Sequence, residues 1–376
     1  MSVRLPRGDG SPVDLVKTLA SAADAQAAFT GSMPIDQRYQ FDLDKLGALL
    51  RSHVAGFDKD FVVEQFRGGQ SNPTFLVRSN DQRCVVRRKP AGQLLRSAHA
   101  IDREYRVLKA LSEAGFPVPT PHAYCDDASI IGSEFYVMSF ADGRVYWDPA
   151  LPQESPQSRQ AIYAEAARVI ARLHDIDFRA VGLEGFGKQG GYLGRQIKRW
   201  TEQYRASQTD SLEAMERLID WLPRHLPPND EVSVVHGDFR FDNLVFHPTE
   251  PRVIAVLDWE LSTLGHPTSD FAYHCLKWHL PPGSTRGLAG LDLTAQGIPT
   301  EAQHLRTYRG ERRRSDVLDW DFHIAFNLFR VAAISQGVYR RGLEGNASNA
   351  RALEAGERVR TFAGTGWDIA TGATPV

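Results

Sequence analysis

The chain has 376 residues, enough for two or three units that each bury a core. Its 44 basic residues nearly balance its 46 acidic ones. This balance argues against a nucleic-acid partner, because nucleic-acid affinity rests on a basic surface excess. No stretch approaches the ~20 apolar residues that span a bilayer, so we expect no membrane partner either.

The cysteines and the N-terminus indicate a compartment. Cys84, Cys125 and Cys275 lie far apart and form no CxxC pair. This spacing disfavours a disulfide framework or a zinc site and suits a reducing compartment. The N-terminal stretch MSVRLPRGDGSPVD contains no apolar core of the kind that signal peptides carry. We therefore expect a cytoplasmic protein.

The first third of the chain predicts a small lobe rich in β-strands. Residues 1–40 are rich in Gly, Pro and Ala with little periodic apolar pattern, which indicates a loosely attached N-terminal extension. Residues 41–140 form the predicted lobe, with a helix at 41–54. Short β-type runs follow at 61–66, 74–79, 84–89 and 134–140. A second helix begins near Ser97 and carries an apolar stripe of Ile101, Leu108 and Leu111.

The remainder, residues 141–376, predicts a larger and mainly helical lobe. Helical patterns are present at 158–176, 197–204, 212–222, 269–280, 319–343 and 348–363, and short apolar strands at 231–239 and 252–260. We interpret the run Arg312–Arg314 as a solvated helix end. The predicted fold class is α+β, with two lobes that meet near residue 140.

The strongest chemical signal is HGDFRFDN at 236–243, followed by LDWE at 257–260. Asp238 comes just after an apolar strand, Asn243 follows five residues later, and Asp258 ends a second strand. Phosphoryl transfer needs a group that positions the attacking hydroxyl and oxygen ligands that hold Mg²⁺ on the ATP phosphates. This spacing predicts Asp238 as the catalytic base, with Asn243 and Asp258 as metal ligands. The alternative is that the aspartates are turn formers and a helix cap.

A glycine-containing segment lies between the first two strands of the small lobe. RGGQSNPTF places Gly68, Gly69, Ser71 and Asn72 where backbone N–H groups could cover phosphates. Taken alone, this segment is better explained as a plain hairpin turn. It gains weight from the residues of the third strand and the following helix.

On the third strand, alternation places Arg87 on one face with Val85 and Lys89. Arg87 corresponds best to the strand lysine that contacts ATP phosphates in kinases. Glu104 shares the apolar stripe of the next helix, and a carboxylate on such a face needs a partner. Arg87 is the natural partner. The alternative is a solvated Glu104 at the edge of the stripe.

Two nucleotide-binding patterns further along the chain are set aside. Gly185, Gly187 and Gly190 spell GxGxxG, and residues 182–188 spell GxxxxGK. Gln189 stands where a P-loop requires Ser or Thr. Both motifs also need a preceding buried strand, and here a helix end and a weak apolar run come first.

Matching segments from about residue 60 to residue 350 resemble the aminoglycoside phosphotransferase and choline kinase superfamily. They include GGQSNPTF, VVRRKPAG, AHAIDREYRVLKAL, GSEFYVMSFADGRV, GGYLGRQIKRW, HGDFRFDN, LDWELSTLGHPTSDFAY and FRVAAISQGVYRR. The closer resemblance is to the branch fused to acyl-CoA dehydrogenases in animal proteins. It implies a bilobal protein-kinase-like fold with ATP between the lobes.

The resemblance also implies roles for single residues. The catalytic Asp falls on Asp238 and the metal ligands fall on Asn243 and Asp258. The adenine hinge falls near Met138, Ser139 and Phe140, and Asp270 matches a structural Asp that braces the catalytic loop. Which of Arg87, Arg88 and Lys89 contacts the phosphates stays open, as does a metal role for Glu260.

Charge narrows the class of acceptor. From residue 261 onward the chain has 13 Arg and Lys against 11 Asp and Glu, which does not favour a polycationic aminoglycoside. The branch instead implies a hydroxylated acyl-CoA, with arginines of the C-terminal helices as phosphate contacts. Two other classes stay open: a pseudokinase that regulates a partner, and a metal-dependent phosphohydrolase using His236, Asp238 and Asp258.

Overall fold

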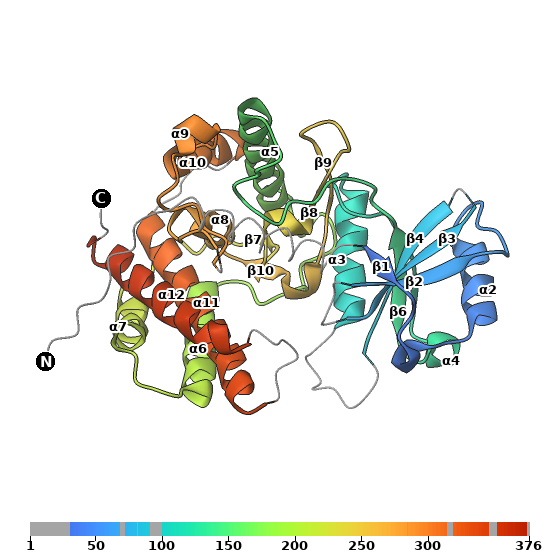
Figure 1. Cartoon of the computed structure of the whole chain (residues 1–376), viewed down its shortest axis with the longest axis horizontal. Helices are drawn as coiled ribbons and strands as arrows, with labels where there is room; N and C mark the ends of the chain where they lie inside the picture. The colour runs from blue at the N-terminus through green and yellow to red at the C-terminus, as the bar shows by residue number, and fades with distance from the viewer. Residues whose placement is uncertain are drawn as a thin grey trace, which may run out of the picture.

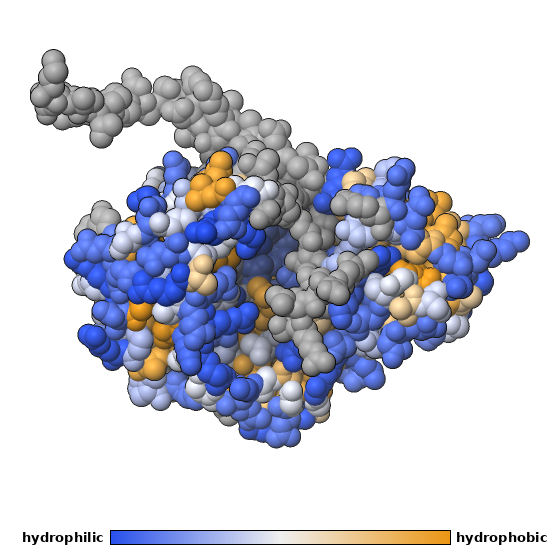
Figure 2. All heavy atoms as spheres, turned by 90° about the horizontal axis from the view of Figure 1, so that it is seen from below, coloured by the Kyte–Doolittle hydropathy of each residue, from blue (hydrophilic) through white to orange (hydrophobic). Residues whose placement is uncertain are grey.

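The computed structural model describes residues 31–67, 72–80, 82–90, 100–283, 285–313, 319–345 and 352–373. Within these ranges, a β-sheet occupies one end of an elongated molecule and helices fill the other end (Figure 1). The part up to Ser139 is called the small lobe below, and the part from Arg144 onward the large lobe. Figure 2 shows that the surface seen from below is hollowed between the two lobes. This architecture confirms the predicted α+β fold class.

The small lobe is built on one antiparallel sheet with the strand order β1-β2-β3-β4-β6-β5. Its strands are β1 (Ser32–Met33), β2 (Val62–Phe66), β3 (Thr74–Ser79), β4 (Gln82–Arg88), β5 (Pro121–Cys125) and β6 (Phe135–Ser139). The edge strand β5 was not predicted, because PHAYC begins with proline and has no alternating apolar pattern. The other long strands lie where the β-type runs predicted them.

Helices cover both faces of this sheet. On one face α2 (Leu43–His53) and α4 (Ala128–Ile131) pack in a cluster with Val86 and other residues of the sheet. On the other face α3 (Ile101–Glu113) contacts β5 and β6 (Figure 1). Because side chains alternate along β4, Arg88 is directed to the α2 side and Arg87 to the α3 side.

The predicted extension is too long at its C-terminal end. Ser32 and Met33 pair with β2, and Tyr39 packs edge-on against Phe75 with ring centroids 6.4 Å apart. Residues 31–40 therefore belong to the small lobe, whose apolar cluster they help to cover. Residues 1–30 of the predicted extension lie outside the described residues.

The large lobe consists mainly of helices. These are α5 (Pro156–His174), α6 (Tyr192–Ser207), α7 (Glu213–Trp221), α8 (Pro267–Cys275), α9 (Leu293–Gln296), α10 (Glu301–Glu311), α11 (Trp320–Leu343) and α12 (Ala355–Ala370). Two strand pairs cross it: β7 (Ser233–Val235) with β10 (Thr263–Gly265), and β8 (Leu244–Phe246) with β9 (Val253–Val256). Helix α10 was not predicted, because only His304 and Tyr308 on it are buried.

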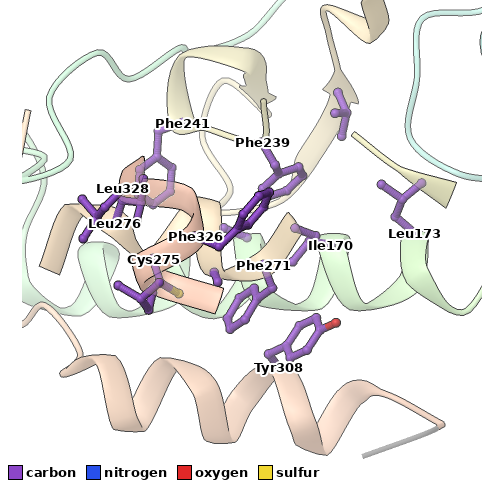
Figure 3. Close-up of a cluster of buried hydrophobic side chains, with 14 of the residues drawn as sticks. Ile170, Leu173, Phe239, Phe241, Phe271, Cys275, Leu276, Tyr308, Phe326 and Leu328 are labelled. Atoms are coloured by element: carbon purple, nitrogen blue, oxygen red, sulfur yellow. The ribbon is translucent and has the colours of Figure 1, made fainter. Parts of the chain in front are cut away.

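The segment with the predicted catalytic motif is packed into the core of the large lobe. Phe239 and Phe241 of that motif are buried in one cluster with Phe271 of α8 (Figure 3), and the ring of His274 packs against all three. Phe271 in turn stacks on Tyr308 of α10, with ring centroids 3.9 Å apart. Aromatic packing against the core thus holds the backbone of the motif in place.

The interpretation of Arg312–Arg314 as a solvated helix end is wrong for Arg312. Its side chain is buried, with Nε 3.0 Å from Asp175 Oδ1 and Nη2 2.5 Å from Glu231 Oε1. Two carboxylates from other parts of the chain neutralise the guanidinium and permit its burial. This long-range pairing has no signal in the local charge run.

The cysteines and helices bear on the expected compartment. Cys84, Cys125 and Cys275 are all free thiols. In the part of the chain that the structure describes, every helix is too short or too polar to cross a bilayer. Cytoplasmic localisation stays a prediction.

Buried histidines predict acid sensitivity. Burial lowers the pKa values of His274 and His304 well below the ordinary range, and both ring nitrogens of His304 lack a hydrogen-bond partner among the described residues. Below pH ~6.5 the unfolded chain takes up protons that the folded chain excludes. The free energy of unfolding should therefore fall as the pH is lowered below 6.5, by up to ~1.4 kcal/mol per pH unit for each such histidine.

Urea unfolding at pH 7.5 and at pH 5.5 measures this loss. His304→Phe should tolerate its site, because the ring already packs against Phe271 and Trp278 at centroid distances of 5.3 and 4.9 Å. The variant should lose less stability than the wild type between the two pH values. If both proteins lost the same amount, the assignment to His304 would be wrong.

Candidate active site

The loop with the predicted catalytic residue Asp238, called the catalytic loop below, connects β7 to β8 and contains the short helix η3 (Phe241–Asn243). The buried rings of Phe239 and Phe241 alternate along it with Asp238, Arg240 and Asp242. Of these three side chains, Arg240 is 43% exposed, Asp238 17% and Asp242 9%. The apolar residues therefore direct the polar ones away from the core.

Asp238 is held by three side chains. Tyr273 Oη donates a hydrogen bond to Oδ1 at 2.6 Å, and Arg240 Nε lies 3.1 Å from the same oxygen. Asn243 Nδ2 donates to Oδ2 at 3.2 Å and to the backbone oxygen of Asp238 at 2.9 Å. Burial, followed by the negative charge of Asp238, raises the pKa of Tyr273, so the phenol stays a donor. Tyr273 and Arg240 were not predicted as site residues.

The backbone of the catalytic loop is braced from both sides. Asp270 accepts hydrogen bonds from the backbone N–H groups of His236 and Gly237, both at 2.8 Å, while Arg330 donates to the Gly237 carbonyl at 2.7 Å. Gly237 has φ +83°, and a Cβ there would lie 2.7 Å from the carbonyl oxygen of Leu261. The contacts of Asp270 are those of the bracing aspartate that the resemblance implied.

A buried hydrogen-bond chain connects Asp270 to Arg312 at the C-terminal end of α10. Arg312 Nη1 donates to Tyr308 Oη at 3.0 Å, and the hydroxyl lies 2.7 Å from His174 Nδ1. His174 Nε2 lies 3.2 Å from Asp270 Oδ2. Burial lowers the pKa of His174, so the ring is neutral and carries its proton on Nε2. Burial alone would raise the pKa of Asp270, but hydrogen bonds from His174 and from the His236 backbone lower it.

Asp258 follows β9 and lies at the border of the two lobes. Its backbone has φ 64° and ψ 64°, a left-handed conformation that aspartate tolerates better than most residues. Arg87 Nη2 of the small lobe lies 3.0 Å from Asp258 Oδ1 and 3.4 Å from Glu260 Oε2. The carboxylates of the large lobe are thus tied to β4.

The expected ion pair between Arg87 and Glu104 is confirmed. Arg87 Nε lies 2.8 Å from Glu104 Oε2, and both side chains are buried. Asn72 Nδ2 and Tyr136 Oη also donate to this carboxylate, at 2.9 and 3.1 Å. Burial raises the pKa of Glu104, and the charge of Arg87 opposes that rise. The alternative of a solvated Glu104 is wrong.

The other residues predicted to bind the nucleotide lie in different surroundings. Gly68, Gly69 and Ser71 lie outside the described residues. Asn72 is fully buried against Glu104, so its side chain holds the ion pair in this structure. Met138 belongs to β6 and packs against the apolar cluster that α3 shares with the large lobe. Phe140 stacks on Phe66 with ring centroids 6.5 Å apart and lies under the Arg83 guanidinium at 4.8 Å.

Arg88, the last residue of β4, and Lys89, which follows it, have other contacts. Arg88 donates to the Ile131 carbonyl at 2.7 Å on the opposite face of the sheet, and Lys89 pairs with Glu134. Arg87 is therefore the one of these three cations that contacts Asp258. The glycines of the GxGxxG pattern lie between α5 and α6 in a segment without a preceding strand, as expected.

The Phosphotransferase enzyme family matches residues 62–309, more than half of the chain. The chain belongs to this family. Acyl-CoA dehydrogenase family member 10 of Mus musculus is 49% identical over 87% of this chain, and family member 11 of Homo sapiens is 43% identical over 88%. The chain spans 30% and 43% of the lengths of these two proteins.

Solved structures support the fold. One from Ralstonia eutropha, named provisionally as an aminoglycoside phosphotransferase, has 52% identity and a TM-score of 0.82, and covers 89% of this chain and 99% of that one. Choline kinase of Cryptosporidium parvum has 15% identity and a TM-score of 0.57, covering 86% and 95%. These similarities confirm the predicted superfamily and its kinase-like fold.

The oxygen atoms of this phosphotransferase-family site fit a magnesium ion. Asn243 uses Nδ2 toward Asp238, and no described donor reaches its Oδ1. Asp258 receives Arg87 on Oδ1, which leaves Oδ2 without a described donor. No cluster of three or more His, Cys, Asp or Glu in the described ranges could hold a metal alone. Mg²⁺ commonly takes one or two protein oxygens and completes its shell with waters and phosphates.

A pocket of about 350 Å³ opens beside the catalytic loop of this family member. Tyr273 and Arg240, the two residues that contact Asp238 Oδ1, both line it. Further walls come from Trp147, Arg286 and Phe362, which lie far apart in the sequence. Only the fold brings these segments together, so sequence reasoning missed the pocket.

Proposed function

We propose that this chain transfers the γ-phosphate of ATP to a hydroxyl group of a small molecule in a magnesium-dependent reaction. The proposal rests on two sets of contacts between the predicted site residues. Asn243 contacts the Asp238 carboxylate in one loop, and Arg87 connects Asp258 to Glu104 across the border of the lobes. Phosphoryl transfer depends mainly on such positioning and on charge stabilisation.

In this proposal Asp238 receives the proton of the acceptor hydroxyl. Tyr273 and Arg240 both contact Oδ1, whereas the Asn243 amide is the one described donor to Oδ2. Oδ2 is therefore the oxygen that would take the proton. Asn243 and Asp258 would hold Mg²⁺, which when bound neutralises phosphate charge. Arg87, kept in place by Glu104, would contribute a positive charge toward the phosphates.

The nucleotide would lie between the lobes. A neighbour of the same fold, an aminoglycoside phosphotransferase at 16% identity and a TM-score of 0.56, was solved with AMP-PNP and hygromycin B. We assign adenine to the segment of Met138 and Phe140, and the phosphates to the loop of Gly68, Gly69, Ser71 and Asn72. The stacked rings of Phe66 and Phe140 offer an apolar surface next to that segment.

For the acceptor we propose a hydroxyacyl-CoA. The curated relatives are named as acyl-CoA dehydrogenase family members, which associates this family branch with acyl-CoA chemistry. The lining of the pocket beside Asp238 includes four cationic side chains and a single carboxylate, a poor match for a polycationic aminoglycoside. A hydroxyl on the acyl chain would be the phosphorylated group.

Incubation of the protein with ATP, Mg²⁺ and a panel of hydroxyacyl-CoAs tests this function. We expect ADP and a new phosphoester to form in equal amounts, only with a hydroxylated acceptor. Release of inorganic phosphate without a phosphoester would instead favour the phosphohydrolase. Nucleotide binding without turnover, across both this panel and a wider metabolite pool, would favour the pseudokinase.

A further inference from the structure

The pocket beside Asp238 combines an apolar wall with an excess of positive charge. Its apolar side includes Trp147, Leu280, Ile334 and Phe362. Its basic side chains are Arg240, Lys277, Arg286 and Arg358, against the single carboxylate of Asp242. Such a lining suits a molecule that has both an apolar part and an anionic part.

The single carboxylate of the pocket lining, Asp242, is already paired with two arginines. Asp242 Oδ2 lies 2.8 Å from Arg286 Nη1 and 3.3 Å from Arg240 Nη2. Arg240 also contacts Asp238, and the Arg286 guanidinium lies 4.9 Å from the centre of the Trp147 ring. These two arginines therefore have their charges compensated within the protein.

Lys277 and Arg358 are not compensated in this way. Among the described residues, no carboxylate lies within salt-bridge distance of either side chain. The charges of Asp242 and Glu301 act on Lys277 only from farther away, and both carboxylates are paired with other residues. Lys277 Nζ donates to the backbone carbonyl of His274, its one described oxygen acceptor, and lies 5.1 and 5.0 Å from the ring centres of Phe241 and Trp278. An ammonium group has three N–H donors, so further donor capacity remains at the pocket wall.

The titration of Lys277 agrees with a site where the nearest carboxylates do not offset the burial of the ammonium group. Burial lowers the pKa of Lys277 to about 7. Removing an ammonium from water without a paired anion is costly, and the lowered pKa reflects this cost. A bound anion would provide the missing partner.

We propose that Lys277, together with Arg358, forms an anion subsite that binds a carboxylate or a phosphate of a ligand whose chain lies on the apolar wall. A hydroxyacyl-CoA has no free carboxylate, so the bound anion would be a phosphate if this ligand is the proposed acceptor. The subsite itself is independent of turnover; only its assignment to the acceptor rests on the proposed function. A volume of about 350 Å³ is at the lower end of the range for ligand pockets. It accommodates a short chain with one anionic group, whereas a whole coenzyme A would extend beyond it.

Binding calorimetry without ATP or Mg²⁺ tests the subsite. The probes are octanoate, which carries a carboxylate on an apolar chain, coenzyme A, which carries phosphates without an acyl chain, and 1-octanol as the neutral comparison. Lys277→Met keeps the length of the side chain between Phe241 and Trp278 and removes its charge. Arg358→Gln removes the second charge from α12, and Lys198→Met, at a lysine that is 79% exposed on α6, is the matched control.

We expect at least one anionic probe to bind the wild type more tightly than 1-octanol. Lys277→Met should weaken that binding about 10- to 100-fold, the range for a lost charged hydrogen bond. Arg358→Gln should weaken it less, and Lys198→Met should leave it unchanged. Preferential binding of octanoate identifies a carboxylate subsite, and preferential binding of coenzyme A identifies a phosphate subsite.

Two results would overturn the subsite. One is that neither anion binds better than 1-octanol. The other is an anion affinity that is the same in wild type, Lys277→Met and Arg358→Gln, each shown to be folded by its thermal transition. Because no turnover is measured, an inactive protein that still binds the anion through Lys277 would count against the proposed function alone.

Discussion

Asp238→Asn should lower kcat at least ~100-fold with a hydroxylated acceptor and change ATP affinity by no more than a few-fold. The amide is nearly isosteric and can still interact with Tyr273, but it cannot take a proton from the attacking hydroxyl. General-base catalysis commonly contributes 10²–10⁴-fold, which sets the expected size of the loss. ATP affinity should persist because no proposed nucleotide contact involves this side chain.

Steady-state kinetics and calorimetry with a non-hydrolysable ATP analogue separate the two quantities. Asp220→Asn, at an exposed position of α7, is the matched control and should have wild-type kcat. An Asp238→Asn protein that phosphorylated its acceptor at the wild-type rate would leave Asp238 with a structural role only.

Asp258→Ala should abolish the strengthening of ATP binding by Mg²⁺. Asn243 and Asp258 are the two proposed protein ligands, and Asp258 is the charged one. The side chain is 36% exposed, so its loss creates no buried cavity. The left-handed backbone at this position costs alanine roughly 1 kcal/mol, which a folded domain tolerates.

Glu260→Gln is the comparison that separates a metal ligand from a partner of Arg87. Both Asp258 and Glu260 contact Arg87, at 3.0 and 3.4 Å, so both substitutions disturb the same cation. Calorimetry with and without Mg²⁺ should show the metal effect intact in Glu260→Gln and absent in Asp258→Ala. A folded Asp258→Ala protein with unchanged magnesium-dependent affinity would contradict the assignment.

Local patterns in the sequence were enough to predict the main elements and the chemistry of the motif. Period-2 runs predicted β3 and β4, and the stripe that includes Ile101 predicted α3. The pairing of Glu104 with Arg87 could also be predicted, because a carboxylate within an apolar stripe requires a partner and alternation directs Arg87 to that side. Each of these inferences depends on neighbours within a few residues or on one physical requirement.

Tertiary structure alone decided which distant residues meet. Tyr273 and Arg330 reach the catalytic loop from α8 and α11, and neither has a local pattern that marks it as a contact. Arg312 lies in a run of arginines that looks solvated, yet carboxylates from two other segments permit its burial. Local sequence patterns were enough for the α+β fold class and for the proposed catalytic motif. The pocket exists only because helices far apart in the chain pack together, and so does the placement of Lys277 beyond salt-bridge distance of every described carboxylate. No short-range periodicity encodes this packing.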